Sequence, residues 1–357
     1  MNKSTGNLIF TLTPARSIED IVSSHTGGKI FIITDSNCLD LCVRPLLAET
    51  PSLEKARVIV TAPGDENKNL TSLTQIWSEL QSGGATRNSL VINIGGGVVT
   101  DMGGFAAATF KRGVEMVNVP TTLLSAVDAA VGGKTGINFN GFKNELGSFY
   151  PANEVVISTC WFDTLPHEEL LSGYAEMLKH GLLEGDEEIN MLLDYDVAEA
   201  NAEKLLPLLQ KSVEVKRRVV EEDPYEHGIR KALNLGHTAG HAFESLALNS
   251  GRPVPHGYAV AWGLVVDLIL SHMQLKFDSM LIHRLASFVK AHYGAPAISC
   301  DDYPEIIRLM SHDKKNVTPD RIVFTLLSEP GKVEINRVAT ESEIKSALDI
   351  MRDLLGC

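Results

Sequence analysis

The stretch LVINIGGGVVTDMGGFAAATF, residues 90–110, decides the fold of this chain. Its first part, Leu90–Ile94, is an apolar, β-branched run that predicts a strand, and three glycines, Gly95–Gly97, follow it directly. The small residues after the glycines predict a helix. Glycines let backbone N–H groups approach a pyrophosphate closely, and the positive end of a helix favours its charge. The stretch therefore indicates a dinucleotide-binding loop, although the spacing is not GxGxxG and a plain tight turn is the alternative.

On both sides of this stretch, short β-branched runs alternate with amphipathic segments. The predicted strands are Lys29–Thr34, Arg57–Thr61, Leu90–Ile94, Glu115–Val119 and residues 154–158. Such alternation is typical of a parallel α/β sheet of the Rossmann-like kind.

From about residue 164 onward, the apolar positions recur with the period of a helix. The predicted helices cover residues 164–183, 198–222, 236–249, 257–275, 279–292 and 341–354, and a small hairpin pairs 321–327 with 332–336. With 357 residues, two domains are expected: an α/β nucleotide-binding domain over 1–160 and a mainly helical metal- and substrate-binding domain over 161–357. The active site is expected in the cleft between them.

The composition excludes several classes of protein. The net charge of -13 argues against a nucleic-acid partner, because binding phosphates needs a concentrated basic face. The five cysteines form no CxxC pair, which argues against a disulfide framework or a thiolate zinc site. Neither a signal peptide nor a run of about 18 apolar residues is visible, so we expect a cytoplasmic protein without a membrane span.

A set of histidines in the second half suggests a metal site. His237 and His241 are four residues apart and would share a helical face with Glu244. The HExxH pattern of zinc proteases is ruled out, because Thr238 follows the first histidine. A catalytic zinc takes three protein ligands, and Glu176 and His256 are further candidates. Spacing alone favours the pair of His237 and His241.

Other polar residues lie where a cofactor or an anion would bind. Asp35, at a strand end, suits a ribose hydroxyl, although a turn-forming Asp-Ser-Asn is the alternative. Asp65, Lys68 and the pair Thr121–Thr122 also follow strands and could complete this site. Several cations could bind a small substrate with more than one negative charge, and the alternative is that each is simply solvated at the surface. They are Arg112, Lys134, Lys143 beside Asn144, Lys216, Arg230 and the pair Lys314–Lys315.

Taken together, several segments resemble the 3-dehydroquinate synthases, in the right order from about residue 30 to 330. They are residues 95–113, 120–138, 143–149 (KNELGSF), 164–181, 228–244, 256–263 (HGYAVAWG) and 313–315 (DKK). The resemblance implies Glu176, His237 and His256 as metal ligands and moves His241 from the metal to the substrate.

The resemblance also implies the remaining site residues. Substrate would be bound by Asp128, Lys134, Asn144, Lys179, Lys216, Arg230, Asn234, His241 and one lysine of the 314/315 pair, with Lys314 preferred. Arg112 would reach the neighbouring site of a homodimer. NAD+ would be bound by Asp35, Asn37, Asp65, Lys68, Gly95, Gly96, Gly97, Val98, Asp101, Thr121, Thr122, Lys143 and Thr164.

The activity implied is conversion of 3-deoxy-D-arabino-heptulosonate 7-phosphate to 3-dehydroquinate and phosphate, a step of the shikimate pathway. It proceeds by transient NAD+ oxidation at C5, phosphate elimination, re-reduction and aldol cyclisation, with one divalent metal, Zn²⁺ or Co²⁺. The sequence departs from the family at Asp65, where Glu is usual, and at Tyr258, which replaces the Glu of HGE. Alternatives are a sugar-phosphate cyclase of the inosose or valiolone type and a metal-dependent polyol dehydrogenase.

Overall fold

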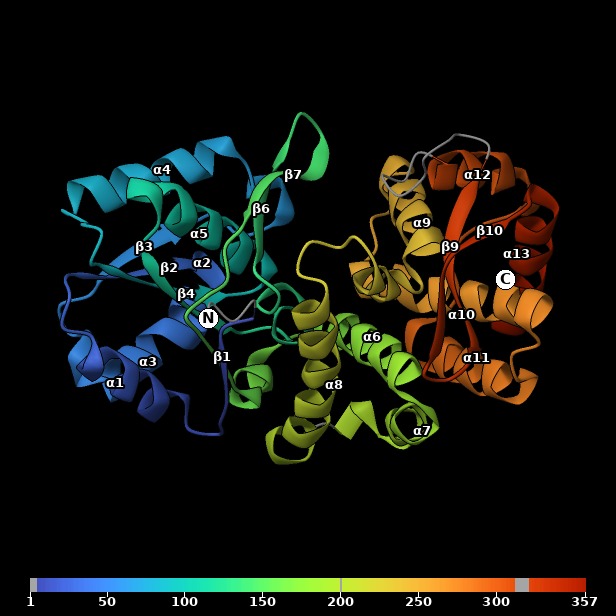
Figure 1. Ribbon diagram of the computed structural model, residues 1–357, viewed down its shortest axis with the longest axis horizontal. Coiled ribbons are helices and arrows are strands. Elements are labelled where there is room, and N and C mark those ends of the chain that lie inside the picture. The colour runs from blue at the N-terminus through green and yellow to red at the C-terminus, as the bar shows by residue number, and fades with distance from the viewer. Residues whose placement is uncertain (1–4, 200, 312–320) are drawn as a thin grey trace. The chain divides into compact units, whose positions relative to one another are not determined.

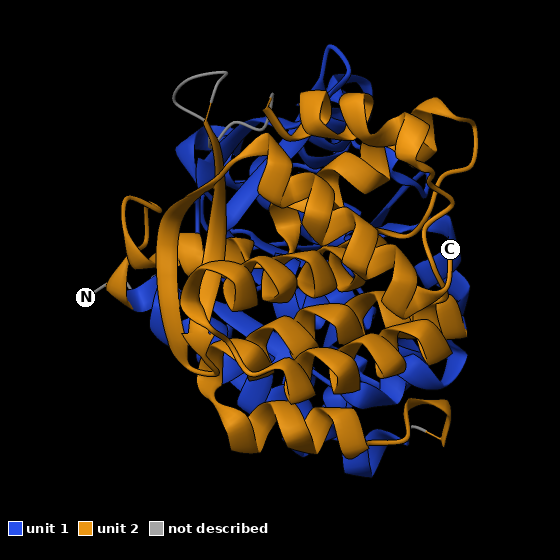
Figure 2. Ribbon diagram, turned by 90° about the vertical axis from the view of Figure 1, so that its right-hand side faces the viewer, with its two compact units in different colours: residues 1–166, 200–221 blue, residues 167–199, 222–357 orange. Residues whose placement is uncertain are grey.

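The structure is a computed structural model that describes residues 5–199, 201–311 and 321–357. The chain divides into two compact units, one with residues 1–166 and 200–221 and the other with 167–199 and 222–357 (Figure 2). This grouping differs from the predicted boundary after residue 160, because residues 161–166 and 200–221 belong with the first unit. Thr159, for example, donates a hydrogen bond to the carbonyl of Ala202 at 2.7 Å.

Within the described residues, the first unit contains a six-stranded parallel sheet in the order β1-β8-β5-β4-β2-β3 (Figure 1). The strands are β1 (Asn7–Phe10), β2 (Ile30–Asp35), β3 (Arg57–Thr61), β4 (Leu90–Gly95), β5 (Glu115–Pro120) and β8 (Glu154–Ile157). All predicted strands are confirmed. β1 was not predicted, because this edge strand is only partly buried and carries a weaker apolar signal.

Helices cover both faces of the sheet. The helices of this unit are α1 (Pro14–Ser24), α2 (Ser36–Cys38), α3 (Arg44–Glu49), α4 (Leu70–Ser82), α5 (Gly97–Thr109) and α8 (Ala202–Glu222). α1 and α3 lie on one face, and α4 and α5 lie on the other (Figure 1). Every residue of β4 is buried, which explains its uninterrupted apolar run. Single-turn or π-helical segments lie at Leu39–Val43, Pro51–Leu53, Asp65–Asn67, Phe110–Arg112, Ser125–Ala129 and Thr159–Thr164.

An antiparallel hairpin of β6 (Lys134–Phe139) and β7 (Phe142–Phe149) was not predicted. Its turn residues, Asn140 and Gly141, both have positive φ, 49° and 83°. Asn-Gly is the preferred sequence for such a two-residue turn. That dipeptide is the sequence signal for this hairpin.

The second unit is mainly helical, as predicted. Its helices are α6 (His167–Glu184), α7 (Asp186–Asp194), α9 (His237–Asn249), α10 (His256–Leu275), α11 (Ser279–Tyr293), α12 (Tyr303–Ser311) and α13 (Glu341–Leu355). Short 3-10 segments are Val197–Glu199, Ile229–Asn234 and Cys300–Asp302. β9 (Ile322–Glu329) and β10 (Lys332–Ala339) form the predicted hairpin. α7 and α12 were not predicted.

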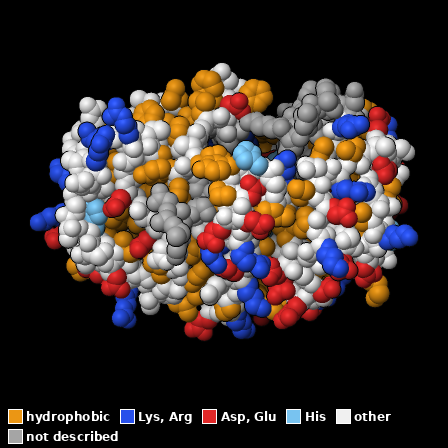
Figure 3. Space-filling model, in the orientation of Figure 1, with side chains coloured by type: hydrophobic (Ala, Val, Ile, Leu, Met, Phe, Trp, Pro, Cys, Tyr) orange, Lys and Arg blue, Asp and Glu red, His pale blue; other side chains and the backbone are white. Residues whose placement is uncertain are grey.

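α10 is the central helix of this unit and packs against α6, α9, α11, α13 and β9. Among the described helices it alone is long and apolar enough to cross a membrane by length and composition. However, 72% of its most apolar stretch is buried inside the protein, which is the environment of a core helix. On the face drawn in Figure 3, Lys and Arg side chains are interspersed with Asp and Glu, as on an ordinary solvated surface.

Candidate active site

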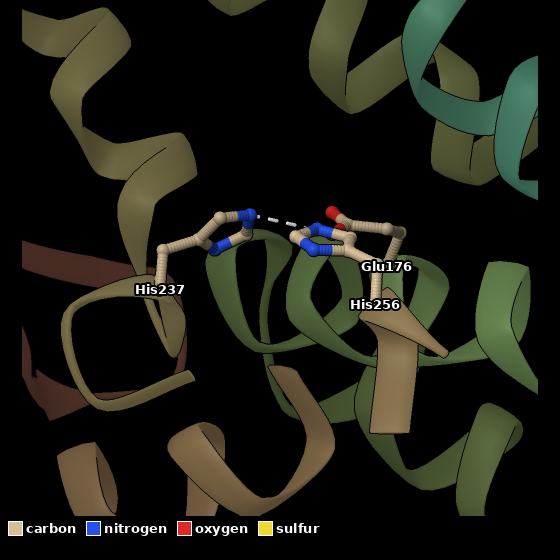
Figure 4. Close-up of side chains that lie close together, drawn as sticks. All are labelled: Glu176, His237 and His256. Carbon is tan, nitrogen blue, oxygen red and sulfur yellow. Dashed lines mark ion pairs between the residues drawn. The ribbon is translucent and has the colours of Figure 1, made fainter. Parts of the chain in front are cut away.

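Three side chains of the second unit converge on one point (Figure 4). Glu176 lies in the middle of α6 and is fully buried, and His237 and His256 are the first residues of α9 and α10. One potential ligand atom of each lies within 4.8 Å of the others. The Nε2 atoms of His237 and His256 are 3.4 Å and 3.6 Å from Oε1 of Glu176.

The other ring nitrogen of each histidine has its own partner. Nδ1 of His237 is 3.0 Å from the carbonyl oxygen of Leu235, and Nδ1 of His256 is 3.0 Å from Oε2 of Glu244. Because both partners are acceptors, each Nδ1 carries a proton and donates it. This arrangement leaves both Nε2 atoms directed at Glu176, and it is the usual arrangement around a metal-binding histidine.

The environment of Glu176 fits a bound cation. Its carboxylate is buried and forms an ion pair with the ammonium group of Lys179, and its oxygens otherwise accept no hydrogen bond of standard geometry from the residues that the structure describes. A buried carboxylate is costly unless it is paired or binds a metal. Two imidazole nitrogens and one carboxylate are the donor set of a catalytic divalent metal with an open coordination position.

The pKa values of the cluster follow from burial and close charges. Burial alone would raise the pKa of Glu176, but Lys179 and His237 hold it well below its usual range. Burial lowers the pKa of His237 to about 4. Burial opposes the charge of His256 too, yet its neighbours Glu176 and Glu244 raise its pKa to about 10. Without a metal, His256 is therefore protonated, and its positive charge lies close to where a cation would bind.

His241 lies beside this cluster. Its ring centroid is 5.3 Å from that of His237 and 5.9 Å from that of His256. Spacing along the chain favoured His237 and His241 as a ligand pair. Helix α10 brings His256 instead to Glu176, since its first turn packs on α6: Gly257 donates its N–H to Ser172 Oγ at 3.0 Å.

The glycine loop of the first unit joins β4 to α5. Gly96 immediately precedes α5, so Gly97 and Val98 lie in its first turn. The N–H groups of a first turn have no carbonyl of the same helix one turn earlier to bind. A Cβ on Gly96 would lie 3.2 Å from the Thr122 side chain. Thr121 donates its N–H to the carbonyl of Gly95 at 3.0 Å, which brings the end of β5 to the loop.

Two buried lysines of the first unit bind carboxylates. Lys68 Nζ lies 2.5 Å from Asp101 Oδ2 and 2.5 Å from Asn144 Oδ1. Burial raises the pKa of Asp101, and the Lys68 ammonium opposes this effect. Lys216 on α8 donates to Asp128, at 2.6 Å from Oδ1. The structure thus joins Lys68 and Asp101, expected at the cofactor, to Asn144, expected at the substrate.

Two other residues expected at the cofactor have defined roles in local structure. Asp35 Oδ1 accepts the N–H groups of Asn37 and Cys38 and caps α2, as the turn-forming alternative predicted. Its position at the end of β2 is also the expected one. Asp65 is held to the β6–β7 hairpin, through Asn138 at 3.2 Å and Lys143 at 3.6 Å.

The remaining expected residues are more scattered. Arg230 is buried and donates to the carbonyl of Pro224 at 2.5 Å, and Asn234 donates to Glu226 at 3.1 Å. Arg112, Lys134 and Thr164 are exposed. Lys314 and Lys315 lie outside the described residues.

Two carboxylates near the histidines received no role from the sequence. Glu244 was seen only as a member of the helical face of His237. Asp267 lies fully buried on α10 and accepts the N–H of Gly236 at 2.6 Å. Its signal was a lone acidic residue in an otherwise apolar run, since a buried charge needs a partner.

Comparisons with known proteins agree with this arrangement. A family model described as 3-dehydroquinate synthase N-terminal matches residues 58–172, and one described as 3-dehydroquinate synthase C-terminal matches residues 173–316. The 3-dehydroquinate synthase of Parabacteroides distasonis is 49% identical over 339 residues, 95% of this chain and 96% of the relative. That of Pyrococcus abyssi is 41% identical and covers 94% of this chain and 96% of its own.

The fold is also that of a solved cyclase. A crystal structure of 2-deoxy-scyllo-inosose synthase, complexed with carbaglucose-6-phosphate, NAD+ and Co²⁺, superposes with a TM-score of 0.84 at 23% identity. It covers 98% of this chain and 96% of that one. At that identity the likeness establishes the fold, whereas the two family models and the closer relatives together span both units and the Glu176–His237–His256 cluster. By these matches, the chain belongs to the 3-dehydroquinate synthase family.

Proposed function

We propose that this chain is a 3-dehydroquinate synthase, which converts 3-deoxy-D-arabino-heptulosonate 7-phosphate to 3-dehydroquinate and phosphate. The observation that carries the proposal is the buried Glu176 with two histidine Nε2 atoms directed at it. It occurs in a chain that is 49% identical to a 3-dehydroquinate synthase along almost its whole length.

The enzyme would use NAD+ and one divalent metal, Zn²⁺ or Co²⁺. Support comes from the donor set of Glu176, His237 and His256 and from the narrow glycine loop at α5. When bound, NAD+ would accept a hydride from C5 and later return it, and the metal would act as a Lewis acid toward the C4 and C5 oxygens. Cofactor contacts would come from the first unit, residues 1–166 and 200–221, and metal ligands from the second, residues 167–199 and 222–357.

The substrate carries a phosphate and a carboxylate, so its recognition needs cations. Lys134, Asn144, Asn234, His241 and Lys314 would bind the phosphate end, with Lys179, Lys216 and Asp128 around the ring hydroxyls. Arg230 would bind the carboxylate. Its burial supports this role, because a guanidinium held in a buried position can bind a planar carboxylate through two parallel hydrogen bonds.

Proton transfer at C6 would need no dedicated side chain. Oxidation at C5 acidifies the neighbouring C6 proton, and the phosphate group of the substrate itself can accept this proton before it leaves from C7. The protein then has to hold the phosphate in place. Lys134→Ala should accordingly lose most turnover, and full turnover in this variant would contradict the assignment of Lys134 to the phosphate.

The test measures the stoichiometry of the reaction products. Metal-loaded protein is incubated with 3-deoxy-D-arabino-heptulosonate 7-phosphate and catalytic NAD+, and phosphate, 3-dehydroquinate and NADH are measured together. Equal yields of phosphate and 3-dehydroquinate without accumulating NADH are expected. Continuous NADH formation with a polyol would instead indicate a dehydrogenase. Turnover only with a substrate that lacks the carboxylate would indicate an inosose- or valiolone-forming cyclase.

The oligomer and the location belong to the same proposal. The enzyme would be a cytoplasmic homodimer in which Arg112 reaches the neighbouring site. The exposure of Arg112 and its left-handed backbone, with φ of 69°, support a role outside its own unit's core.

A further inference from the structure

The two helices that begin at the histidines of the cluster each carry a second carboxylate farther along. α9 begins at His237 and carries Glu244, and α10 begins at His256 and carries Asp267. Neither carboxylate belongs to the cluster of Glu176, His237 and His256. Each one instead contacts the beginning of the other helix.

Glu244 orients the histidine of α10. Its Oε2 accepts the Nδ1–H of His256 at 3.0 Å, and its side chain is only 17% exposed. Because Nδ1 is engaged in this way, Nε2 is the ring nitrogen directed toward Glu176, and a metal that displaces its proton would bind there. A hydrogen bond of this kind fixes both the tautomer and the rotation of a ligand ring.

Asp267 holds the turn that precedes the histidine of α9. Its Oδ2 accepts the N–H of Gly236 at 2.6 Å, and Gly236 has the left-handed φ of 79°. The preceding residue, Leu235, supplies the carbonyl that accepts the Nδ1–H of His237. The orientation of the His237 ring is therefore set by a turn that Asp267 fixes.

The two helices pack closely enough for both contacts. A Cβ on Gly263 of α10 would lie 1.9 Å from the carbonyl oxygen of Gly236, so only glycine fits at this crossing. A Cβ on Gly240 of α9 would lie 3.0 Å from the carbonyl oxygen of Ala259. Backbone contact between the helices lets short carboxylate side chains reach from one helix to the start of the other.

We infer that Glu244 and Asp267 are reciprocal positioning residues of the metal site: each lies on the helix of one histidine and orients the other histidine. The inference rests on the proposed metal-dependent function. It goes beyond the ligand set, because it assigns the preorganisation of both histidines to the contact between α9 and α10. It also accounts for a fully buried Asp in an apolar helix, which is costly without a specific role.

The experiment compares Glu244→Leu and Asp267→Leu with the wild-type chain, because leucine has no hydrogen-bond acceptor. Glu341→Leu is the matched control, since it removes an exposed carboxylate from the same unit, 65% exposed in its side chain. Zn²⁺ affinity of the metal-free proteins is measured by competition with a chromophoric chelator, and the visible spectrum of the Co²⁺ forms is recorded. Each of the two variants should weaken Zn²⁺ binding about 10–100-fold and shift the Co²⁺ bands, as loss of an outer partner does.

The possible results distinguish a failure of this inference from a failure of the proposed metal-dependent function. If wild type and control bind Zn²⁺ equally, Glu176→Gln abolishes binding, and either positioning variant binds within twofold of wild type, the reciprocal arrangement is wrong. If the wild-type chain itself binds no metal, the proposed metal site fails and the inference fails with it. Thermal melting of the metal-free forms checks folding, and Asp267→Ala, which also lacks an acceptor, replaces Asp267→Leu if that variant does not fold.

Discussion

The ammonium group of Lys179 contacts Oε2 of Glu176, one turn away on α6, where both side chains are almost completely buried. A positive charge is thus built in beside the carboxylate of the proposed metal site. It keeps Glu176 ionised although burial alone would favour the protonated form.

Glu176→Gln should abolish metal binding and turnover while it preserves the shape of the site. The neutral amide cannot replace the carboxylate, so we expect metal affinity to fall by more than about 100-fold, beyond the loss of an outer partner. Metal content after dialysis and the yield of 3-dehydroquinate measure this. Glu169→Gln, an exposed residue of the first turn of the same helix, should retain both. A Glu176→Gln protein that retains stoichiometric metal would exclude this residue as a ligand.

Breaking the pair of Lys68 and Asp101 should destabilise the first unit. The side chain of Lys68 is 5% exposed, and Lys68→Met would leave the carboxylate of Asp101, whose side chain is 19% exposed, beside an apolar group. Loss of one partner of a buried pair costs about 3–5 kcal/mol in the free energy of unfolding. Denaturant unfolding should show this loss, with a smaller loss in the double variant Lys68→Met/Asp101→Asn.

The control for this experiment is Lys332→Met. Lys332 pairs with Glu329 at the surface, with side chains 68% and 57% exposed. Its removal should change the free energy of unfolding by less than about 1 kcal/mol. Equal effects of Lys68→Met and Lys332→Met would show that the Lys68 pair is worth no more than a surface one.

Gly257→Ala should disturb the metal site through packing alone. A Cβ at this position would lie 2.0 Å from the carbonyl oxygen of Ser172, so the start of α10 would have to move away from α6. Overpacking of this kind costs about 1–3 kcal/mol. It would also displace His256 from Glu176, so metal affinity should fall together with the melting temperature. Ser172→Ala removes only the acceptor of the Gly257 N–H and should cost about 1 kcal/mol.

Mixing two inactive variants should restore activity if Arg112 acts in the neighbouring subunit. In a hybrid dimer of Arg112→Ala with Glu176→Gln, one site has an intact metal set and receives Arg112 from the other chain. Activity should therefore rise after the two proteins are unfolded and refolded together. A mixture as inactive as its components would place Arg112 in its own subunit's site or outside any site.

Much of this fold is determined locally and could be predicted from the sequence. Leu90–Ile94 is apolar at every position but Asn93 because β4 is buried on both faces, and Gly95–Gly97 follow it because α5 starts at close range. The helices α11 and α13 of the second unit follow from the repeat of apolar positions that a half-buried helix requires, whereas the central helix α10 follows from a long, mostly apolar run. Edge strand β1 and the β6–β7 hairpin lack such a repeat, because they are partly exposed.

One part of the metal cluster could be predicted from the sequence, and the other part required the tertiary structure. The sequence by itself placed His237 and His241 on one helical face, because positions four apart on a helix must lie close together. Only the tertiary structure brings His256 and Glu176 to His237 and engages Glu244 and Asp267, since these residues lie on different helices. Their distances depend on how α6, α9 and α10 pack, and that depends on glycines such as Gly257 and Gly263, which admit backbone contact where any side chain would prevent it.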